Sequence, residues 1–111
     1  GNVAVGHNAL GNGTNGGDNN VAIGRNAGIS LNASTSSGNV LIGYNAGSAI
    51  TSGSNNTIIG HVPALVSSVT TGDRNILIGK DIRAMSPTAD DQLNIGNLVY
   101  GTSLASGSTI S

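Results

Sequence analysis

The sequence lacks several residue types on which ordinary folds and sites depend. It has no Cys, Phe, Trp or Glu, and only two Tyr and two Pro among 111 residues. Without Cys there is neither a disulfide framework nor a thiolate metal site. Without large aromatic side chains a globular core loses a main source of buried area. No apolar run approaches the ~20 residues that a membrane-spanning helix needs, so we expect no membrane insertion.

Charged residues are also scarce. They make up 8 % of the chain, against ~25 % in typical soluble proteins. The net charge of −1 gives no reason to expect nucleic-acid binding. A glycan-cleaving site would need two carboxylates at a defined gap, but the acids here, all Asp, are scattered. We therefore expect no enzyme activity, no cofactor and no metal site.

What the sequence does contain is a repeat. Six strings of five residues follow one pattern: a polar residue, two mostly small or apolar residues, then Ile-Gly or Val-Gly. The closing glycines recur every 17 to 19 residues over nearly the whole chain, which is typical of stacked-repeat architectures. The strings are residues 2–6, 20–24, 39–43, 56–60, 75–79 and 92–96.

Each string predicts a short β-strand. The first position after the polar residue and the third are mostly Val or Ile, which favour extended backbone. Residues two apart share one face of a strand. We therefore expect positions such as Val21 and Ile23 to face the interior of the coil.

The middle position of the strings indicates that copies of the chain associate with one another. It is apolar in five strings and large in three of them, so both strand faces favour burial. A single coil has one interior, and the economical partner for the other face is a second copy of the chain. The alternative is that a longer loop of the same chain covers it. The middle residues are Ala4, Ala22, Leu41, Ile58, Leu77 and Asn94.

The rest of each repeat predicts how the coil closes. After the glycine we expect a second, weaker strand or a bend that packs a small residue inward, and then a Gly-, Ser-, Thr- and Asn-rich return segment. The leading asparagines, Asn2, Asn20, Asn39, Asn56 and Asn75, should stack as a ladder. The predicted fold is an all-β parallel β-solenoid or β-roll of about six coils, in a homotrimeric rod.

The repeats cover residues 1–102. We expect residues 103–111, which are rich in Ser and Gly, to be a tail or the start of a further repeat. Because the chain already opens inside a repeat, we expect it to be a piece of a longer polypeptide.

These residues resemble two families of fibrous proteins. The strings are similar to head repeats of trimeric autotransporter adhesins, although the period here is longer and less even. Residues 20–28 and 39–47 resemble more closely the repeats of bacteriophage tail fibres, and residues 91–102 resemble the string near the end of such regions. The resemblance implies a trimeric β-solenoid in an extracellular or virion fibre.

Several single residues could belong to a metal or ligand site, and each also has a purely structural explanation. His7 and His61 lie three coils apart, about 14 Å along the stack, so one chain cannot use both to bind one metal ion. They are expected to be turn residues; the alternative is that three copies of one His bind an ion on the axis of a trimer. Asp18, Asp73, Asp90 and Asp91 sit in turns where calcium could bind, with ordinary turn chemistry favoured. Tyr44 and Tyr100 are the only aromatic platforms.

The sequence thus predicts a structural segment of a trimeric fibre, a phage tail fibre or similar virion appendage that supports host attachment. The alternatives are a bacterial adhesin head on the cell surface and the shaft of a glycan-degrading tailspike. The partners expected are copies of the chain and a host-surface glycan or protein receptor. Residues 30–38 and 62–72 are the variable loops that a receptor could contact.

Overall fold

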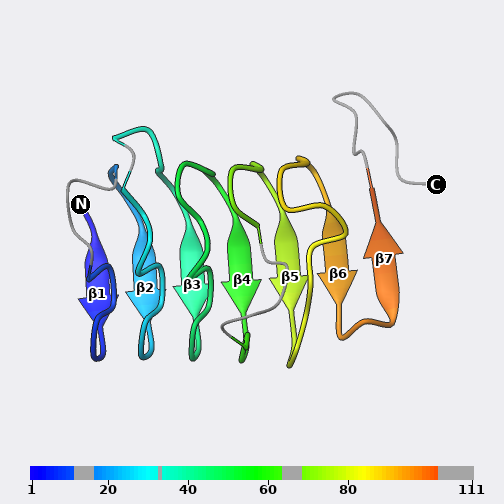
Figure 1. Cartoon of the computed structure of the whole chain (residues 1–111), viewed down its shortest axis with the longest axis horizontal. Helices are drawn as coiled ribbons and strands as arrows, with labels where there is room; N and C mark the ends of the chain where they lie inside the picture. The colour runs from blue at the N-terminus through cyan, green and yellow to red at the C-terminus, as the bar shows by residue number, and fades with distance from the viewer. Residues whose placement is uncertain (12–16, 33, 64–68, 103–111) are drawn as a thin grey trace.

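The computed structural model describes residues 1–11, 17–32, 34–63 and 69–102. Within these ranges, seven strands of three residues form one sheet in chain order (Figure 1). The first six are parallel and the seventh is antiparallel to the sixth. The strands are β1 (Val3–Val5), β2 (Val21–Ile23), β3 (Val40–Ile42), β4 (Thr57–Ile59), β5 (Ile76–Ile78), β6 (Leu93–Ile95) and β7 (Val99–Gly101).

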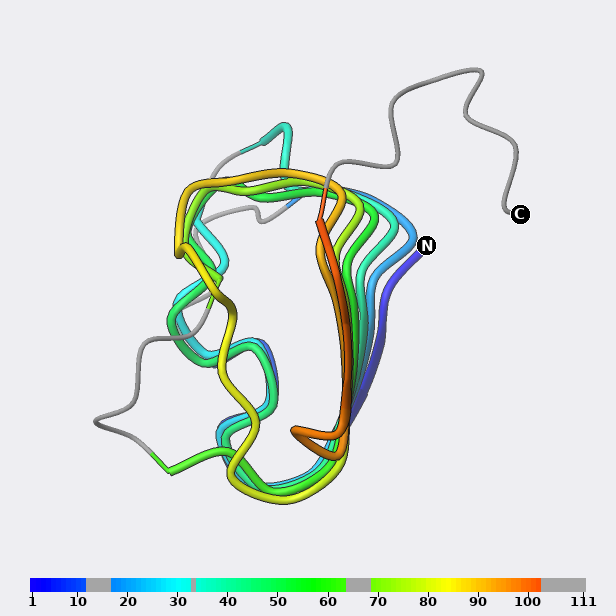
Figure 2. The same cartoon turned by 90° about the vertical axis from the view of Figure 1, so that its right-hand side faces the viewer.

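The chain is an all-β solenoid of about five turns. Equivalent strand residues pair without slip from β1 to β6; for example, Val21 is opposite Val40 and Ile23 is opposite Ile42. Viewed along the stack, the strands superpose on one side of the coil and the turns and return segments close the other sides (Figure 2). We refer to each coil by the number of its strand.

Among the described residues, coils 1 to 5 each contain one strand, so the second strand that was one of the two predicted forms was wrong there. Residues 7–10 and 25–28 after the first two glycines form turns. The alternative of a bend that packs a small residue inward is confirmed, because Ala27 and Ala46 are fully buried. A left-handed Asn directly precedes each of these alanines, with φ 59° at Asn26 and 55° at Asn45, and this bends the chain before an extended segment can form.

The predicted inward face of the strands was also wrong. The middle residues point into the coil, where Ala22, Leu41 and Ile58 are completely buried, and the flanking residues point out. A three-residue strand that turns at both ends has room for one inward side chain. The remaining interior is filled from the turn and from the return segment, through residues such as Leu31 and Ile50.

The repeat glycines allow the coils to stack closely. Gly43 has φ 127°, which L residues rarely adopt, and a Cβ there would collide with the carbonyl oxygen of Gly60 in the next coil. Only glycine combines this backbone angle with such a close approach.

The predicted asparagine ladder is confirmed. The Asn39 side-chain oxygen accepts the backbone N–H of Asn56 at 3.0 Å and its side-chain amide at 3.1 Å. Asn75 makes the same two bonds to Asn56, and Asn20, Asn39, Asn56 and Asn75 are all buried. The ladder satisfies polar groups at a corner that water does not reach.

Coil 6 ends this pattern. Gln92 still donates to the Asn75 side chain, but its own side-chain oxygen accepts the N–H of Ser86. Asn94 takes the apolar middle position, where its side chain donates to the carbonyl of Arg83 and accepts the N–H of Asn97. The chain then reverses into β7, so the last coil of the parallel stack has polar side chains at its core and an antiparallel strand at its edge.

Two further observations concern the ends and the membrane. The predicted tail, residues 103–111, lies outside the described residues. Within the part of the chain that the structure describes, no helix has the length and apolar character to cross a bilayer.

Candidate functional site

The outward face of β1–β6 is an exposed apolar surface, which we call the strand face. Its side chains come from the first and third residues of each strand, and eleven of the twelve are aliphatic. The most exposed of them retain 36 % to 55 % of their surface in contact with solvent. The residues are Val3, Val5, Val21, Ile23, Val40, Ile42, Thr57, Ile59, Ile76, Ile78, Leu93 and Ile95.

The strand face is regular because the sheet beneath it is in register. Parallel strands lie ~4.8 Å apart and advance ~3.3 Å per residue, so the face measures about 24 Å by 10 Å. A contiguous apolar patch that stays open to water often marks an interaction site. This surface is the strongest functional feature of the fold.

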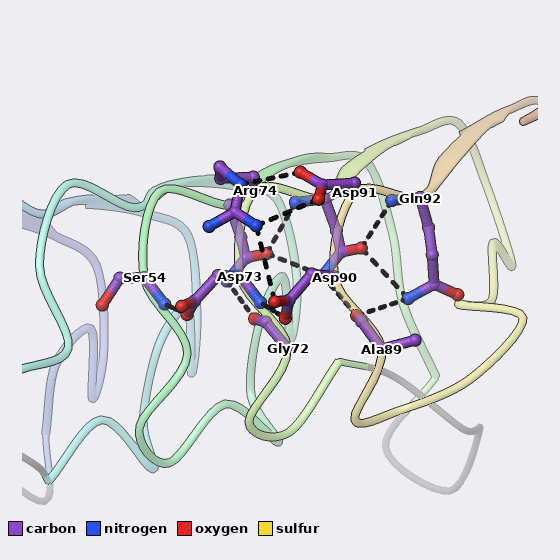
Figure 3. Close-up of polar contacts among 10 residues, drawn as sticks. Ser54, Gly72, Asp73, Arg74, Ala89, Asp90, Asp91 and Gln92 are labelled. Carbon is purple, nitrogen blue, oxygen red and sulfur yellow. Dashed lines mark hydrogen bonds and ion pairs between the residues drawn. The ribbon is translucent and has the colours of Figure 1, made fainter. Parts of the chain in front are cut away.

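One border of the strand face, the leading rim, is formed by the residues three positions before strands β2 to β6. Their side chains form a second ladder: the N–H of Ser54 donates to Asp73 at 2.7 Å, and the N–H of Asp73 donates to Asp90 at 2.8 Å (Figure 3). The N–H groups of Asp18 and Ser37 donate to the next serine hydroxyl in the same way. The leading rim therefore consists of Asp18, Ser37, Ser54, Asp73 and Asp90.

An ion pair lies beside the C-terminal end of this rim. Arg74 donates to Asp91 through Nε at 2.7 Å and through a terminal nitrogen at 3.0 Å, and it also reaches Asp90 at 3.4 Å (Figure 3). The hydrogen bond from Arg74 lowers the pKa of Asp91 below its ordinary value, and the bond to Asp91 raises the pKa of Arg74. Arg74 therefore offsets two of the acids within the chain.

The opposite border, the trailing rim, is formed by the residues that follow the repeat glycines. Arg25 lies over the Tyr44 ring at 6.0 Å, and the Tyr44 and His61 rings stack with centroids 5.2 Å apart. His61 approaches Asp81 at 3.5 Å, and Lys80 approaches the same carboxylate at 3.7 Å. The trailing rim consists of His7, Arg25, Tyr44, His61 and Lys80, all exposed.

The structure places the predicted single-residue sites in these rims. His7 and His61 lie on the trailing rim in coils 1 and 4, and His61 stacks on an aromatic ring. Asp18, Asp73 and Asp90 occupy the same position of their repeats, so the expectation of acids scattered without a pattern was wrong. Over the described ranges, no group of three or more His, Cys, Asp or Glu side chains is arranged to hold a metal ion.

The two tyrosines are separated. Tyr44 is in the trailing-rim stack, and Tyr100 lies in β7 with half of its surface exposed. The variable loops fall partly outside the described residues, at residue 33 in the first loop and 64–68 in the second.

Sequence reasoning missed the two rims. The signal was available, because Asp or Ser recurs three residues before five of the six strands. It is obscured because this position varies between Asp and Ser, so the acids alone show no period. Comparisons with protein families, with curated proteins and with solved structures find no match.

Proposed function

We propose that this chain is a structural segment of a homotrimeric fibre, of the kind found in bacteriophage tail fibres or similar virion appendages, and that it has no enzymatic role. Its task is mechanical: it holds a host-contacting part of the fibre at a distance and supports attachment. The observation that carries the proposal is the strand face, which is apolar, in register and open on the outside of a coil whose core is already filled.

A trimer would remove the apolar side chains of the strand face from contact with water. Three copies arranged around an axis parallel to the stack would each turn the strand face inward and form a shared core of Val and Ile side chains. Burial of apolar surface stabilises such a core by about 25 cal/mol per Å². The two exposed rims then remain at the borders between copies, and the return segments form the outer surface of the rod.

Sedimentation equilibrium tests the assembly. We expect a mass three times the chain mass of 10.8 kDa, and a variant with Ile23→Lys and Ile59→Lys on the strand face should sediment as a folded monomer. A wild-type chain that is a well-folded monomer at all concentrations would overturn the proposal. Circular dichroism on both proteins separates loss of association from loss of folding.

Immunogold electron microscopy tests the setting. Antibodies against the chain should label thin fibres on virus particles whose genome encodes this sequence. Label on the surface of bacterial cells would instead support an adhesin, whose head would bind a host or matrix protein directly.

A further inference from the structure

The two rims of the strand face carry opposite charge in matching coils. Coil 2 has Asp18 on its leading rim and Arg25 on its trailing rim. Coil 5 has Asp73 on its leading rim and Lys80 on its trailing rim. Coils 3 and 4 have serines on the leading rim and the uncharged Tyr44 or the ring of His61 on the trailing rim.

The two charges of a coil cannot meet within one chain. Asp18 and Arg25 lie on opposite sides of strand β2, whose three residues alone advance ~10 Å. Asp18 has 83 % of its side chain exposed. Arg25 is also exposed. Both charges are therefore available to another molecule.

The size of the strand face requires that contact between copies extend to the rims. A stable interface commonly covers roughly 800 Å² on each partner, and a surface of about 24 Å by 10 Å falls well short of that. The rims are the surfaces that directly border the face, so an interface large enough to be stable includes them.

From this charge pattern we infer that neighbouring copies join leading rim to trailing rim, with their stacks pointing the same way and with no axial shift. Asp18 of one copy then lies level with Arg25 of the next, and Asp73 lies level with Lys80. This inference rests on the proposed assembly and specifies its polarity and register. Asp90 and Asp91 are not required, because Arg74 pairs with both inside the chain.

The opposite packing is disfavoured by the same charges. If two fully overlapping copies met with their stacks antiparallel and their strands aligned, coil 2 would lie across from coil 5. Asp18 would then face Asp73, and Arg25 would face Lys80. Like charges in contact oppose association, and this repulsion is reduced by Asp81 beside Lys80 and by Arg74 near Asp73; Asp18 and Arg25 keep their full effect. The rims thus select the parallel arrangement.

A charge-reversal cycle tests the inference. Asp18→Lys or Arg25→Glu alone should raise the dissociation constant of the assembly about tenfold at low salt, since each exposed pair is weak but recurs at every border between copies. Asp18→Lys with Arg25→Glu should restore it to within about threefold, and salt should reduce all of these differences. A double variant as weak as the sum of the single variants would overturn the rim pairing.

Cross-linking provides a second readout that does not depend on affinity. The chain has no Cys, so Asp18→Cys with Arg25→Cys introduces the only thiols. A bis-maleimide with a span shorter than ~10 Å, the length of the strand between the two positions, should join neighbouring copies into covalent oligomers. The matched control, Asp18→Cys with Lys80→Cys, places the thiols three coils apart, ~14 Å along the stack, and should remain largely unlinked.

The outcomes separate the two proposals. Efficient linking of the control pair, or no linking of the matched pair in a chain that sediments as an oligomer, would overturn the register while leaving association through the strand face intact. A wild-type chain that never associates would overturn both. Covalent trimers from the matched pair would support both, and covalent dimers alone would support the register but contradict a threefold fibre.

Discussion

Asn39 and Asn56 lie one above the other in adjacent coils, and the side-chain oxygen of Asn39 accepts both the backbone N–H and the side-chain amide of Asn56. The Asn56 amide also donates to the carbonyl of Gly72. The Asn56 side-chain oxygen in turn accepts the N–H of Asn75, so this one buried side chain bonds to groups on both sides of its coil and holds adjacent coils together.

Replacing Asn56 by Ala should destabilise the chain by about 2–4 kcal/mol, because the buried N–H of Asn75 and the carbonyl of Gly72 both lose a partner. The adjacent Asn55 is a matched control. It is exposed and has φ 58°, an angle that glycine adopts freely, so Asn55→Gly should change stability by less than about 0.5 kcal/mol. Urea unfolding of both variants measures the difference. Equal losses would contradict the role of the ladder.

Replacing Gly43 by Ala should cost about 3 kcal/mol or more, since the residue has a left-handed backbone and a new Cβ would strike the next coil. Gly96 has φ 60° and open space where its Cβ would lie. Gly96→Ala should therefore cost only about 1–2 kcal/mol, the penalty for a left-handed alanine. Thermal and urea unfolding compare the two variants. A mild effect at Gly43 would show that the coils can separate to admit a methyl group.

Ile58 and Ile59 test which face of the strand is the core. Ile58 is fully buried, whereas Ile59 keeps 36 % of its surface exposed. Ile58→Ala leaves a cavity and should cost about 2–5 kcal/mol at every protein concentration. Ile59→Ala should lower stability mainly through association, so its effect should depend on concentration. Unfolding curves at several concentrations distinguish them, and the reverse pattern would restore the inward face predicted from the sequence.

Asp91 and Arg74 should give the chain an acid-sensitive contact. The folded pKa of Asp91 is lowered below its ordinary value of 3.8, first through its hydrogen bond with Arg74. Its contribution to stability is therefore complete above that ordinary value and disappears as the pH falls through the lowered folded pKa. Between neutral pH and strong acid, the wild type should lose more stability than Asp91→Asn.

Arg74→Asn supplies the matched variant for this contact. Asn tolerates the left-handed backbone at both positions, where φ is 55° at Arg74 and 57° at Asp91. Arg74→Asn should remove at least as much of the acid dependence as Asp91→Asn, because Arg74 also contacts Asp90, and the double variant should remove no more than Arg74→Asn alone. Additive effects of the two substitutions, measured by urea unfolding from neutral to acid pH, would contradict a direct pair.

Much of the fold was predictable from local chemistry. The spacing of the glycines, together with the β-branched residues before them, was enough to predict parallel strands in register. The recurrence of Asn20, Asn39, Asn56 and Asn75 at one repeat position was enough to predict the ladder. These features repeat with the chain, and a period alone brings equivalent residues into line.

The strand faces and the rims depend on longer-range relations. Val40, Leu41 and Ile42 are all apolar, so no pattern within the strand says which of them is inside. Which side chain faces inward depends on the interior volume of the narrow coil, and because the chain turns at both ends of the strand, that volume holds only the middle side chain. Asp73 and Lys80 appear unrelated in the sequence, and they become borders of one surface only when the coils stack.

The sequence by itself determined the repeat, the strands and the asparagine column, because each follows from residue type and spacing. Only the tertiary structure decided that Leu41 is core while Val40 and Ile42 point outward, and that the chain reverses at β7. Those outcomes depend on the volume enclosed by a closed coil and on contacts between residues a full turn apart, such as that of Gln92 with Asn75, which no local preference encodes.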